Sequence, residues 1–131
     1  AQLRTVEELM ITGNKIPFVN ENLNMKKALQ IISSKKLGTL IVQNNKKITT
    51  GIITDGQIRR VNAIKNNLQD LSVKKVMTRN PISINQDTLA EKALALMNTK
   101  KITSLCVHNQ RNTKRTIGIL HIHDILRTNI H

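Results

Sequence analysis

Aromatic side chains are almost missing from this 131-residue chain, which has one phenylalanine and no tryptophan or tyrosine. Proteins that bind unpaired nucleic acid stack the bases on such rings, so the composition argues against a single-strand-binding site. Cysteine is nearly as scarce, because Cys106 stands alone inside an apolar run. A lone cysteine excludes an internal disulfide framework and is typical of a buried thiol in a reducing compartment.

Long apolar segments are also missing. No run approaches the roughly 20 residues that a membrane-spanning helix needs. The first residues, 1–9, are polar and mixed in charge, and so do not resemble a signal peptide. We therefore expect a cytoplasmic protein without a membrane partner.

Acidic residues are few: eight of them face 21 lysines and arginines, which gives a net charge of +13. A balance of this size is the electrostatic footprint of many nucleic-acid-binding proteins. Here, much of the positive charge comes as separate pairs: Lys26-Lys27, Lys35-Lys36, Lys46-Lys47, Lys74-Lys75 and Lys100-Lys101. Because these pairs form no stripe in the sequence, nucleic acid is the least favoured partner.

The chain contains an internal repeat. The segment around Lys27 returns around Lys92, 65 residues later, and Gly51 returns as Gly118, 67 residues later. The difference of two residues falls in a loop at 111–115, where an insertion is easily tolerated. Two similar units in so short a chain are expected to pack face to face, with a ligand cleft between them.

Hydrophobic periodicity gives both repeats, residues 1–66 and 67–131, the same order of elements, β-α-β-β-α. The fold class is therefore α/β (α+β), with two pseudo-symmetric repeats. Apolar runs indicate strands buried on both faces, and the segment from Thr88 to Glu91 has the pattern of a helix capping box. The expected strands are 18–19, 39–42 and 48–53, then 82–84, 104–107 and 116–120; the expected helices are 23–34, 90–98, one from 55 and one from about 123.

The turn after the last strand of the first repeat is the best candidate for a ligand site. Thr54 offers a hydroxyl, and Gly56 lets the backbone approach a ligand closely at the start of a helix. A helix N-terminus favours an anion such as phosphate, and Arg59 and Arg60 add positive charge nearby. The alternative is that Asp55 simply caps the helix and the arginines are solvated.

A metal site and a nucleophile are both weaker interpretations. His121 and His123 lie at alternate positions and Asp124 adds a carboxylate, but zinc sites need three or four ligands and no third ligand of fixed spacing is evident. We therefore expect hydrogen-bonding roles for these side chains and no metal. Cys106 is predicted to be a buried thiol rather than a reactive thiolate, and no catalytic residue is assigned.

Four motifs occur in order along the chain: ELMITGNKIP at 8–17, GIITDGQIRR at 51–60, KITS at 101–104 and GILHIHDILR at 118–127. A Gly-apolar-apolar-Thr sequence leading from a strand into a helix resembles the CBS domain, so the chain is similar to a pair of CBS domains. Together the four motifs resemble the C-terminal CBS pair of the bacterial arabinose-5-phosphate isomerases. The resemblance covers almost the whole chain.

The resemblance implies a regulatory module that senses a ligand and takes part in oligomerisation. In that family an N-terminal sugar-isomerase domain interconverts D-arabinose 5-phosphate and D-ribulose 5-phosphate, which supplies 3-deoxy-octulosonate for lipopolysaccharide or capsule. This chain has no room for that domain, so by itself it is expected to have no isomerase activity and to require no cofactor. A stand-alone sensor of adenosine nucleotides is the alternative, and a basic nucleic-acid-binding module is the third.

The resemblance also implies a set of ligand-binding residues. In CBS pairs a Ser/Thr hydroxyl after the last strand and an Asp three residues later contact the phosphate and ribose of an adenosine nucleotide. The first repeat has Thr54 but Gln57 in place of that Asp, and the second has Asp124 but His121 in place of the Ser/Thr. A ribose bound through two hydroxyls prefers a carboxylate acceptor, whereas Gln57 has one carbonyl acceptor. A nucleotide-sugar effector therefore stays open beside an adenosine nucleotide. The candidate residues are Ile16, Gly38, Thr39, Thr54, Asp55, Gly56, Gln57, Arg60, Thr103, Ser104, His121, His123 and Asp124.

The last helix of each repeat carries apolar residues that exceed the needs of a small core, namely Ile58 and Val61 in the first repeat and Ile125 and Leu126 in the second. An apolar surplus on exposed helices is typical of an interface between copies. We therefore expect a homo-oligomer, at least a dimer.

Overall fold

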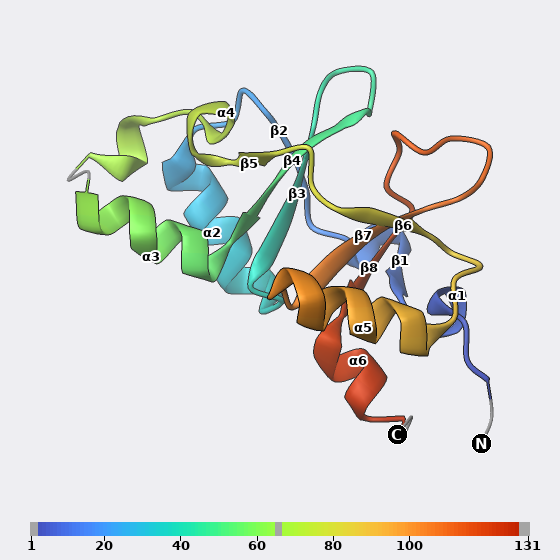
Figure 1. Ribbon diagram of the computed structural model, residues 1–131. Helices are drawn as coiled ribbons and strands as arrows, with labels where there is room; N and C mark the ends of the chain where they lie inside the picture. The colour runs from blue at the N-terminus through green and yellow to red at the C-terminus, as the bar shows by residue number, and fades with distance from the viewer. Residues whose placement is uncertain (1–2, 65–66, 129–131) are drawn as a thin grey trace. The chain divides into compact units, whose positions relative to one another are not determined.

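The computed structural model describes residues 3–64 and 67–128 (Figure 1). The chain divides into two compact units. Unit 2 is the continuous segment Lys15–Pro81, and unit 1 combines Ala1–Asn14 with Ile82–His131. The N-terminal segment, which belongs to the first repeat in the sequence, is thus part of the unit that contains the second repeat.

Unit 2 is a four-stranded sheet in the order β2-β3-β4-β5, covered by helices. Strands β2 and β3 are parallel, whereas β3 and β4 form an antiparallel hairpin and β5 pairs antiparallel with β4. Its elements are β2 (Phe18–Asn20), α2 (Met25–Lys35), β3 (Thr39–Gln43), β4 (Thr49–Thr54), α3 (Asp55–Ile64), η2 (Leu68–Asp70), α4 (Val73–Val76) and β5 (Thr78–Arg79).

Local chemistry explains where α2 begins and ends. The side chain of Asn24 accepts a hydrogen bond from the Lys27 backbone N–H at 2.9 Å, which satisfies one of the free donors of the first turn. The helix ends at Lys35 and is followed by Lys36, whose left-handed backbone (φ 59°) is common after the last helical turn. In between, Met25, Ala28 and Ile32 recur on one face and are buried.

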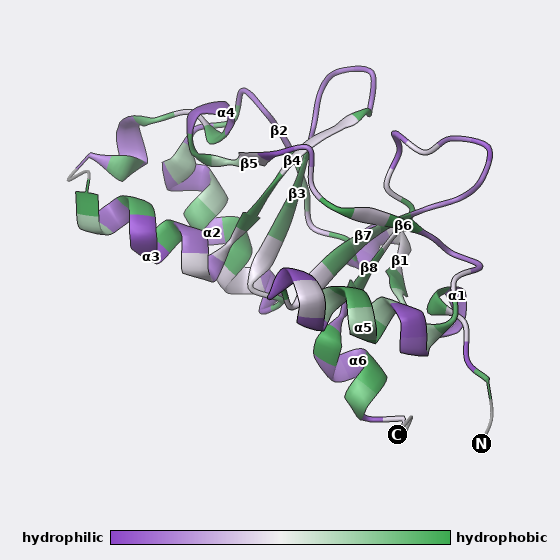
Figure 2. Cartoon of the chain, in the orientation of Figure 1, coloured by the Kyte–Doolittle hydropathy of each residue, from purple (hydrophilic) through white to green (hydrophobic). Residues whose placement is uncertain are grey.

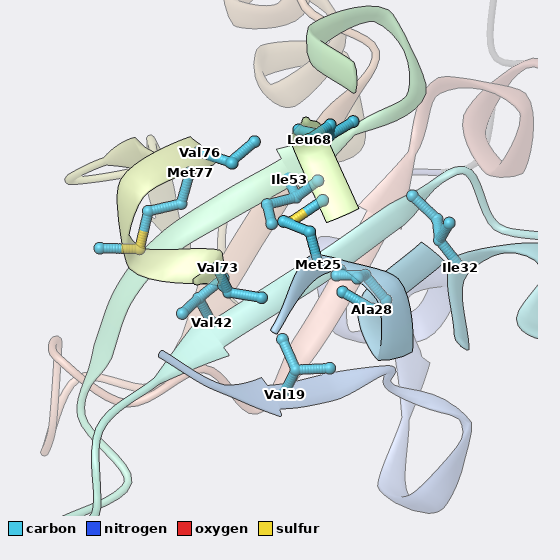
Figure 3. Close-up of a cluster of buried hydrophobic side chains, with 11 residues drawn as sticks. Val19, Met25, Ala28, Ile32, Val42, Ile53, Leu68, Val73, Val76 and Met77 are labelled. Atoms are coloured by element: carbon cyan, nitrogen blue, oxygen red, sulfur yellow. The ribbon is translucent and has the colours of Figure 1, made fainter. Parts of the chain in front are cut away.

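The core of unit 2 lies between α2, α4 and the sheet (Figure 3). Met77 packs against Gly51 so closely that a Cβ on that glycine would overlap the Met77 sulfur and lie 2.9 Å from the Thr78 carbonyl oxygen. The glycine therefore makes room for a core side chain. The buried cluster comprises Val19, Met25, Ala28, Ile32, Leu40, Val42, Ile53, Leu68, Val73, Val76 and Met77.

Unit 1 repeats this architecture with a sheet in the order β1-β8-β7-β6. Its edge strand β1 comes from the N-terminal segment and pairs antiparallel with β8, with Ile11 opposite Ile119. The short helix η1 (Gly13–Lys15) then leads into unit 2. The other elements of unit 1 are α1 (Val6–Leu9), β1 (Ile11–Thr12), β6 (Ser83–Asn85), α5 (Ala90–Lys100), β7 (Ser104–His108), β8 (Gly118–His121) and α6 (Ile122–Leu126).

The two units use equivalent hydrogen bonds to hold the segment before their edge strands. In unit 2 the Val73 N–H donates to the Leu23 carbonyl at 2.7 Å, and in unit 1 the Val6 N–H donates to the Thr88 carbonyl at 2.8 Å. Met10 packs on Gly118 as Met77 packs on Gly51. Unit 2 is therefore completed by α4 and β5, which precede α5 in the sequence. Unit 1 is completed by α1 and β1, which precede α2.

The structure confirms the α/β class and the β-α-β-β-α order. Burial on both faces holds for β3 and β7, where the first four residues of each are buried. The loops of the β3–β4 and β7–β8 hairpins are hydrophilic, in contrast to these buried strands (Figure 2). The two-residue strands β1 and β5 are additions that periodicity did not predict.

The cap of α5 differs from expectation. The helix α5 begins at Ala90 as predicted, but the capping box predicted at Thr88 is wrong, because the N-cap residue is Leu89 and no side chain caps the helix. Instead, the Ala90 N–H donates to the carbonyl of Arg4 at 2.7 Å, so the N-terminal segment satisfies the start of this helix.

The surplus of apolar residues in the last helices is also smaller than predicted. Ile125 is fully buried, and Ile58 and Val61 pack against the core of unit 2, whereas Leu126 is 50% exposed. Among the described residues, no helix has the length and apolar character to cross a membrane.

Candidate functional site

The candidate site of unit 2 is the turn between β4 and α3. Thr39, which begins β3, lies opposite Thr54, which ends β4. The Asp55 N–H donates to the Gly38 carbonyl at 3.0 Å, which fixes the turn to the residue before β3. The parallel register of Phe18 with Ile41 places Ile16, a buried residue two positions before β2, at this same end of the sheet.

Gly38 has a structural reason to be glycine. Its φ of +69° lies in the left-handed region, and a Cβ there would lie 2.9 Å from Asp55 Oδ2. The Asp55 carboxylate therefore lies directly over the backbone of the neighbouring loop. Any larger residue at this position would move that carboxylate.

The first turn of α3 is capped from within. Thr54 Oγ1 accepts a hydrogen bond from the Gln57 N–H at 3.3 Å. The other N–H groups of the turn point along a helix axis whose N-terminal dipole favours negative charge. The threonine hydroxyl thus lies where an anion would meet the helix.

Two guanidinium groups lie close to the same point. A Cβ built on Gly56 would be 3.4 Å from Arg60 Nη1, 3.8 Å from Arg59 Nη2 and 4.0 Å from Thr54 Oγ1. Both arginines are exposed, and none of the ion pairs among the described residues involves either of them. Positive charge at a helix N-terminus is unfavourable by itself, so this arrangement is suited to an anionic ligand.

Gln57 points away from this turn. Its side-chain amide donates to the Val76 carbonyl, which ties α3 to α4. Its Oε1 atom is buried and has no hydrogen-bond partner among the described residues. The sequence position suggested an acceptor for a sugar hydroxyl, whereas the structure places the side chain against the core of unit 2.

Unit 1 has the equivalent turn between β8 and α6. Ser104 lies opposite His121, and the Ile122 N–H donates to the Thr103 carbonyl at 2.8 Å, as Asp55 does to Gly38. The structure thus groups the thirteen candidate residues into two sets: eight from Ile16 to Arg60 in unit 2, and five from Thr103 to Asp124 in unit 1.

The polar groups of the unit 1 turn are satisfied by one another. His121 Nδ1 accepts from the His123 N–H at 3.1 Å, and Asp124 Oδ2 accepts from the His121 N–H at 3.2 Å. The second carboxylate oxygen of Asp124 accepts from Arg127. These bonds form a capping box for α6, and they leave neither oxygen of Asp124 without a partner.

The state of His121 agrees with this geometry. Burial lowers the pKa of His121, and the nearby His123 lowers it further. The two imidazole rings are stacked with their centroids 4.8 Å apart. A neutral His121 is the form that can accept a hydrogen bond at Nδ1.

Cys106 is a buried free cysteine. Burial raises the pKa of the Cys106 thiol to about 11, although a hydrogen bond with Thr116 acts in the opposite direction. In the described part of the chain, no three His, Cys, Asp or Glu side chains gather as a group that could hold a metal ion.

Sequence reasoning missed a recess beside α3. It has a volume of about 340 Å³ and lies within unit 2; its lining residues are Leu29, Ile58, Asn62, Asn67, Leu68, Gln69 and Asp70. The amides Asn67 and Gln69 were the available signal, but the closeness of this segment to α2 depends on tertiary packing.

Comparison with known proteins gives consistent results. The family model for the CBS domain matches residues 6–63 and 73–130. Arabinose 5-phosphate isomerase KdsD of Salmonella typhimurium is 35% identical over 128 residues, which cover 98% of this chain but 38% of that protein. The chain thus spans about two fifths of the length of this relative.

Solved structures share the fold. The CBS domain pair of protein MJ0100, in complex with 5′-methylthioadenosine and S-adenosyl-L-methionine, has a TM-score of 0.84 at 20% identity; the match covers 97% of this chain and 96% of that one. CBSX2 of Arabidopsis thaliana, in complex with AMP, has a TM-score of 0.79 at 22% identity, with 95% and 94% covered.

Proposed function

This chain belongs to the CBS domain family as a tandem pair, and we propose that it is the ligand-sensing regulatory module of an arabinose-5-phosphate isomerase. The support for this parent enzyme is the 35% identity over 98% of the chain to the Salmonella protein. Because the chain spans 38% of that relative, we assign the isomerase chemistry to sequence outside residues 1–131. An isomerase domain is then the partner on which the module acts.

The observation that carries the proposal is the cluster at the start of α3. The Thr54 hydroxyl and the Arg59 and Arg60 guanidinium groups gather within 4.0 Å of the place where a Gly56 Cβ would be. Hydrogen-bond donors, a helix dipole and two cations with no ion pair among the described residues favour a phosphate group. We therefore propose a phosphate-bearing effector, either a nucleotide or a nucleotide-sugar.

Unit 2 is the better of the two sites for the phosphate. Its turn offers the Thr54 hydroxyl and two cations, whereas in unit 1 Asp124 and His121 already bond each other. A ligand at the unit 1 turn would have to displace these bonds. Both turns carry a carboxylate, Asp55 in unit 2 and Asp124 in unit 1, so the comparison rests on the two guanidinium groups of unit 2 that have no ion pair among the described residues. Asp124 is instead suited to a sugar hydroxyl once Arg127 moves away.

A stand-alone adenosine-nucleotide sensor is the second candidate. The observation that favours it is that structures of the same fold carry such ligands: AMP in CBSX2, and 5′-methylthioadenosine with S-adenosyl-L-methionine in the MJ0100 pair. The position of Gln57 favours other ligands, because its acceptor is buried and is turned toward α4. The cytoplasmic location and the association of copies, both expected from the sequence, belong to the proposal as well.

Calorimetric titration tests the site. Purified chain is titrated with AMP, ATP, CMP and the CMP-linked octulosonate. The variant Arg60→Gln removes one guanidinium, and Arg79→Gln, an exposed arginine on β5, is the matched control. A lost charge-assisted hydrogen bond costs roughly 1.5–3 kcal/mol, so Arg60→Gln should weaken binding about 10- to 150-fold while Arg79→Gln leaves it unchanged.

The titration also separates the two candidates. Binding of the CMP-linked sugar but not AMP supports the isomerase module, and binding of AMP alone supports the adenosine sensor. No binding of any compound at millimolar concentration, or equal affinity of both arginine variants and the wild type, would show that the α3 turn is not the phosphate site.

A further inference from the structure

Unit 2 gathers three lysine pairs that are far apart in the sequence. One pair lies in the first turn of α2, one in the loop of the β3–β4 hairpin and one on α4 (Figure 1). We call this set the lysine surface: Lys26, Lys27, Lys46, Lys47, Lys74 and Lys75, all of which are exposed. We propose that the lysine surface binds the phosphate backbone of double-stranded nucleic acid.

Backbone hydrogen bonds bring the three pairs together. The Lys74 N–H donates to the Glu21 carbonyl at 2.9 Å, and the Glu21 N–H donates to the Gln43 carbonyl at 3.0 Å, one residue before the hairpin loop. The Met25 N–H donates to the Leu71 carbonyl at 2.8 Å, which joins the start of α2 to the segment before α4. The fold therefore brings together lysine pairs that are separate in the sequence.

The charge on this surface is largely uncompensated. Lys74 Nζ lies 3.4 Å from Glu21 Oε2, and among the described residues no other lysine of the set has an ion pair. Five of the six ammonium groups thus have no carboxylate partner there. Like charges placed this close are stabilised by a polyanion.

The fold does not require lysine at these positions. In unit 1 the same hydrogen-bonded segments carry Glu7 and Glu8 where unit 2 has Lys74 and Lys75, and Glu91 where unit 2 has Lys26. Both units have the same architecture although the charges at these places are opposite. The lysines are therefore available for a partner rather than needed for folding.

Polar side chains next to the lysines suit a phosphate backbone. A recess of about 370 Å³ lies beside the hairpin, lined by Glu21, Asn22, Asn44, Asn45, Lys46 and Ile48. Asparagine side chains donate hydrogen bonds to phosphate and sugar oxygens in many complexes with nucleic acid. Amide donors thus continue the surface made by the ammonium groups.

Other polyanions fit less well. Among the described residues, none of the exposed large apolar side chains lies on the lysine surface, so it offers nothing to insert into a membrane. The chain has a single aromatic residue, Phe18, so unpaired bases have no stacking partners. A duplex needs neither, because its bases are already stacked and its phosphates are densely spaced.

The lysine surface is separate from the proposed effector site. Strand β4 begins at Thr49, beside the hairpin loop, and ends at Thr54, in the effector turn. The two sites therefore lie at opposite ends of one strand, and the second inference does not depend on the first.

Fluorescence anisotropy with a labelled 20-base-pair DNA duplex and the matching RNA duplex, at 50 to 200 mM salt, tests the proposal. The variant is Lys26→Glu with Lys75→Glu, which copies the residues Glu91 and Glu8 that unit 1 tolerates. The control is Lys92→Glu with Lys114→Glu, which changes the net charge equally in unit 1. Circular dichroism shows whether each variant is folded.

We expect the wild type to bind a duplex with an affinity that falls steeply with salt. Removing two phosphate contacts should weaken binding roughly 60-fold at 0.1 M salt and reduce the salt slope by about 1.8, because each contact contributes about 0.9 to that slope. Equal weakening by the control would show that only the net charge matters and would overturn the proposal. No duplex binding at 50 mM salt, or stronger binding to anionic vesicles or to a polyglutamate peptide, would overturn it too.

Discussion

Two glycines show how a single residue sets the geometry of this chain. Gly13 and Gly38 both have left-handed backbone, with φ of +66° and +69°. A Cβ on Gly13 would have nothing within 4 Å, whereas one on Gly38 would lie 2.9 Å from Asp55 Oδ2. Comparing the same substitution at the two glycines therefore separates the cost of left-handed backbone from the cost of crowding Asp55.

We expect Gly13→Ala to cost about 1 kcal/mol, the price of left-handed backbone for an L-residue. Gly38→Ala should cost about 2 kcal/mol, because Asp55 must also move. Urea unfolding of both variants measures the difference, and adding Asp55→Ala should remove the excess at position 38. Equal costs for the two glycines would show that the contact with Asp55 has no energetic weight.

At the same scale, the sequence allows the content of the site to be predicted but not the direction of every side chain. Thr54 and Gly56 are two residues apart and Arg60 follows one helical turn later, so a strand-to-helix turn brings them together by local geometry alone. The orientation of Gln57 depends on the carbonyl of Val76, which comes from a separate helix. No local pattern carries that information.

Short elements depend on what lies beside them. Strands β1 and β5 have two residues each, and they exist because Ile11 and Thr78 pair with β8 and β4. The start of α5 illustrates the same dependence, because no side chain caps it and the Ala90 N–H donates instead to the Arg4 carbonyl. Periodicity therefore predicts the long helices and central strands, and it misses elements made by tertiary pairing.

The cap of α6 should respond to pH. Because burial and His123 lower the pKa of His121, its NMR titration midpoint should lie below the ordinary value of about 6.5. A base with a lowered folded pKa contributes stability above its unfolded pKa and loses it as the pH falls, so the cap weakens below about pH 6.5. Protonation of Nδ1 would remove the bond from the His123 N–H.

The matched variant is His123→Gln, which removes the neighbouring imidazole but keeps the backbone donor. Without the His123 imidazole, the titration midpoint of His121 should move upward, toward the ordinary pKa of histidine. A midpoint above 6.5 in the wild type, or a downward movement in the variant, would contradict the neutral, hydrogen-bonded form of His121.

At the scale of the whole molecule, sequence order and unit membership differ. Val6 is fully buried in the core of unit 1, and Val73 is fully buried in the core of unit 2. We expect Val6→Ala and Val73→Ala each to destabilise by roughly 2 kcal/mol, from two lost methyl groups and the cavity they leave. The two variants should differ in which unit loses stability: unit 1 for Val6→Ala and unit 2 for Val73→Ala.

Hydrogen exchange measures which unit loses stability. Val6→Ala should speed amide exchange in β7 and β8, and Val73→Ala should speed it in β3 and β4. The opposite result would mean that each N-terminal segment stabilises its own sequence repeat. Circular dichroism at the same temperature controls for global unfolding.

The interrupted path of unit 1 has a consequence for the order of assembly during synthesis. Unit 2 is one continuous stretch, Lys15–Pro81, so all its contacts are available once that stretch has left the ribosome. Unit 1 needs Ala1–Asn14 together with Ile82–His131, so its first segment must wait, unpaired, until the last strand is made. Closing so long a loop is entropically costly and slow, so we expect unit 2 to fold before unit 1 during synthesis.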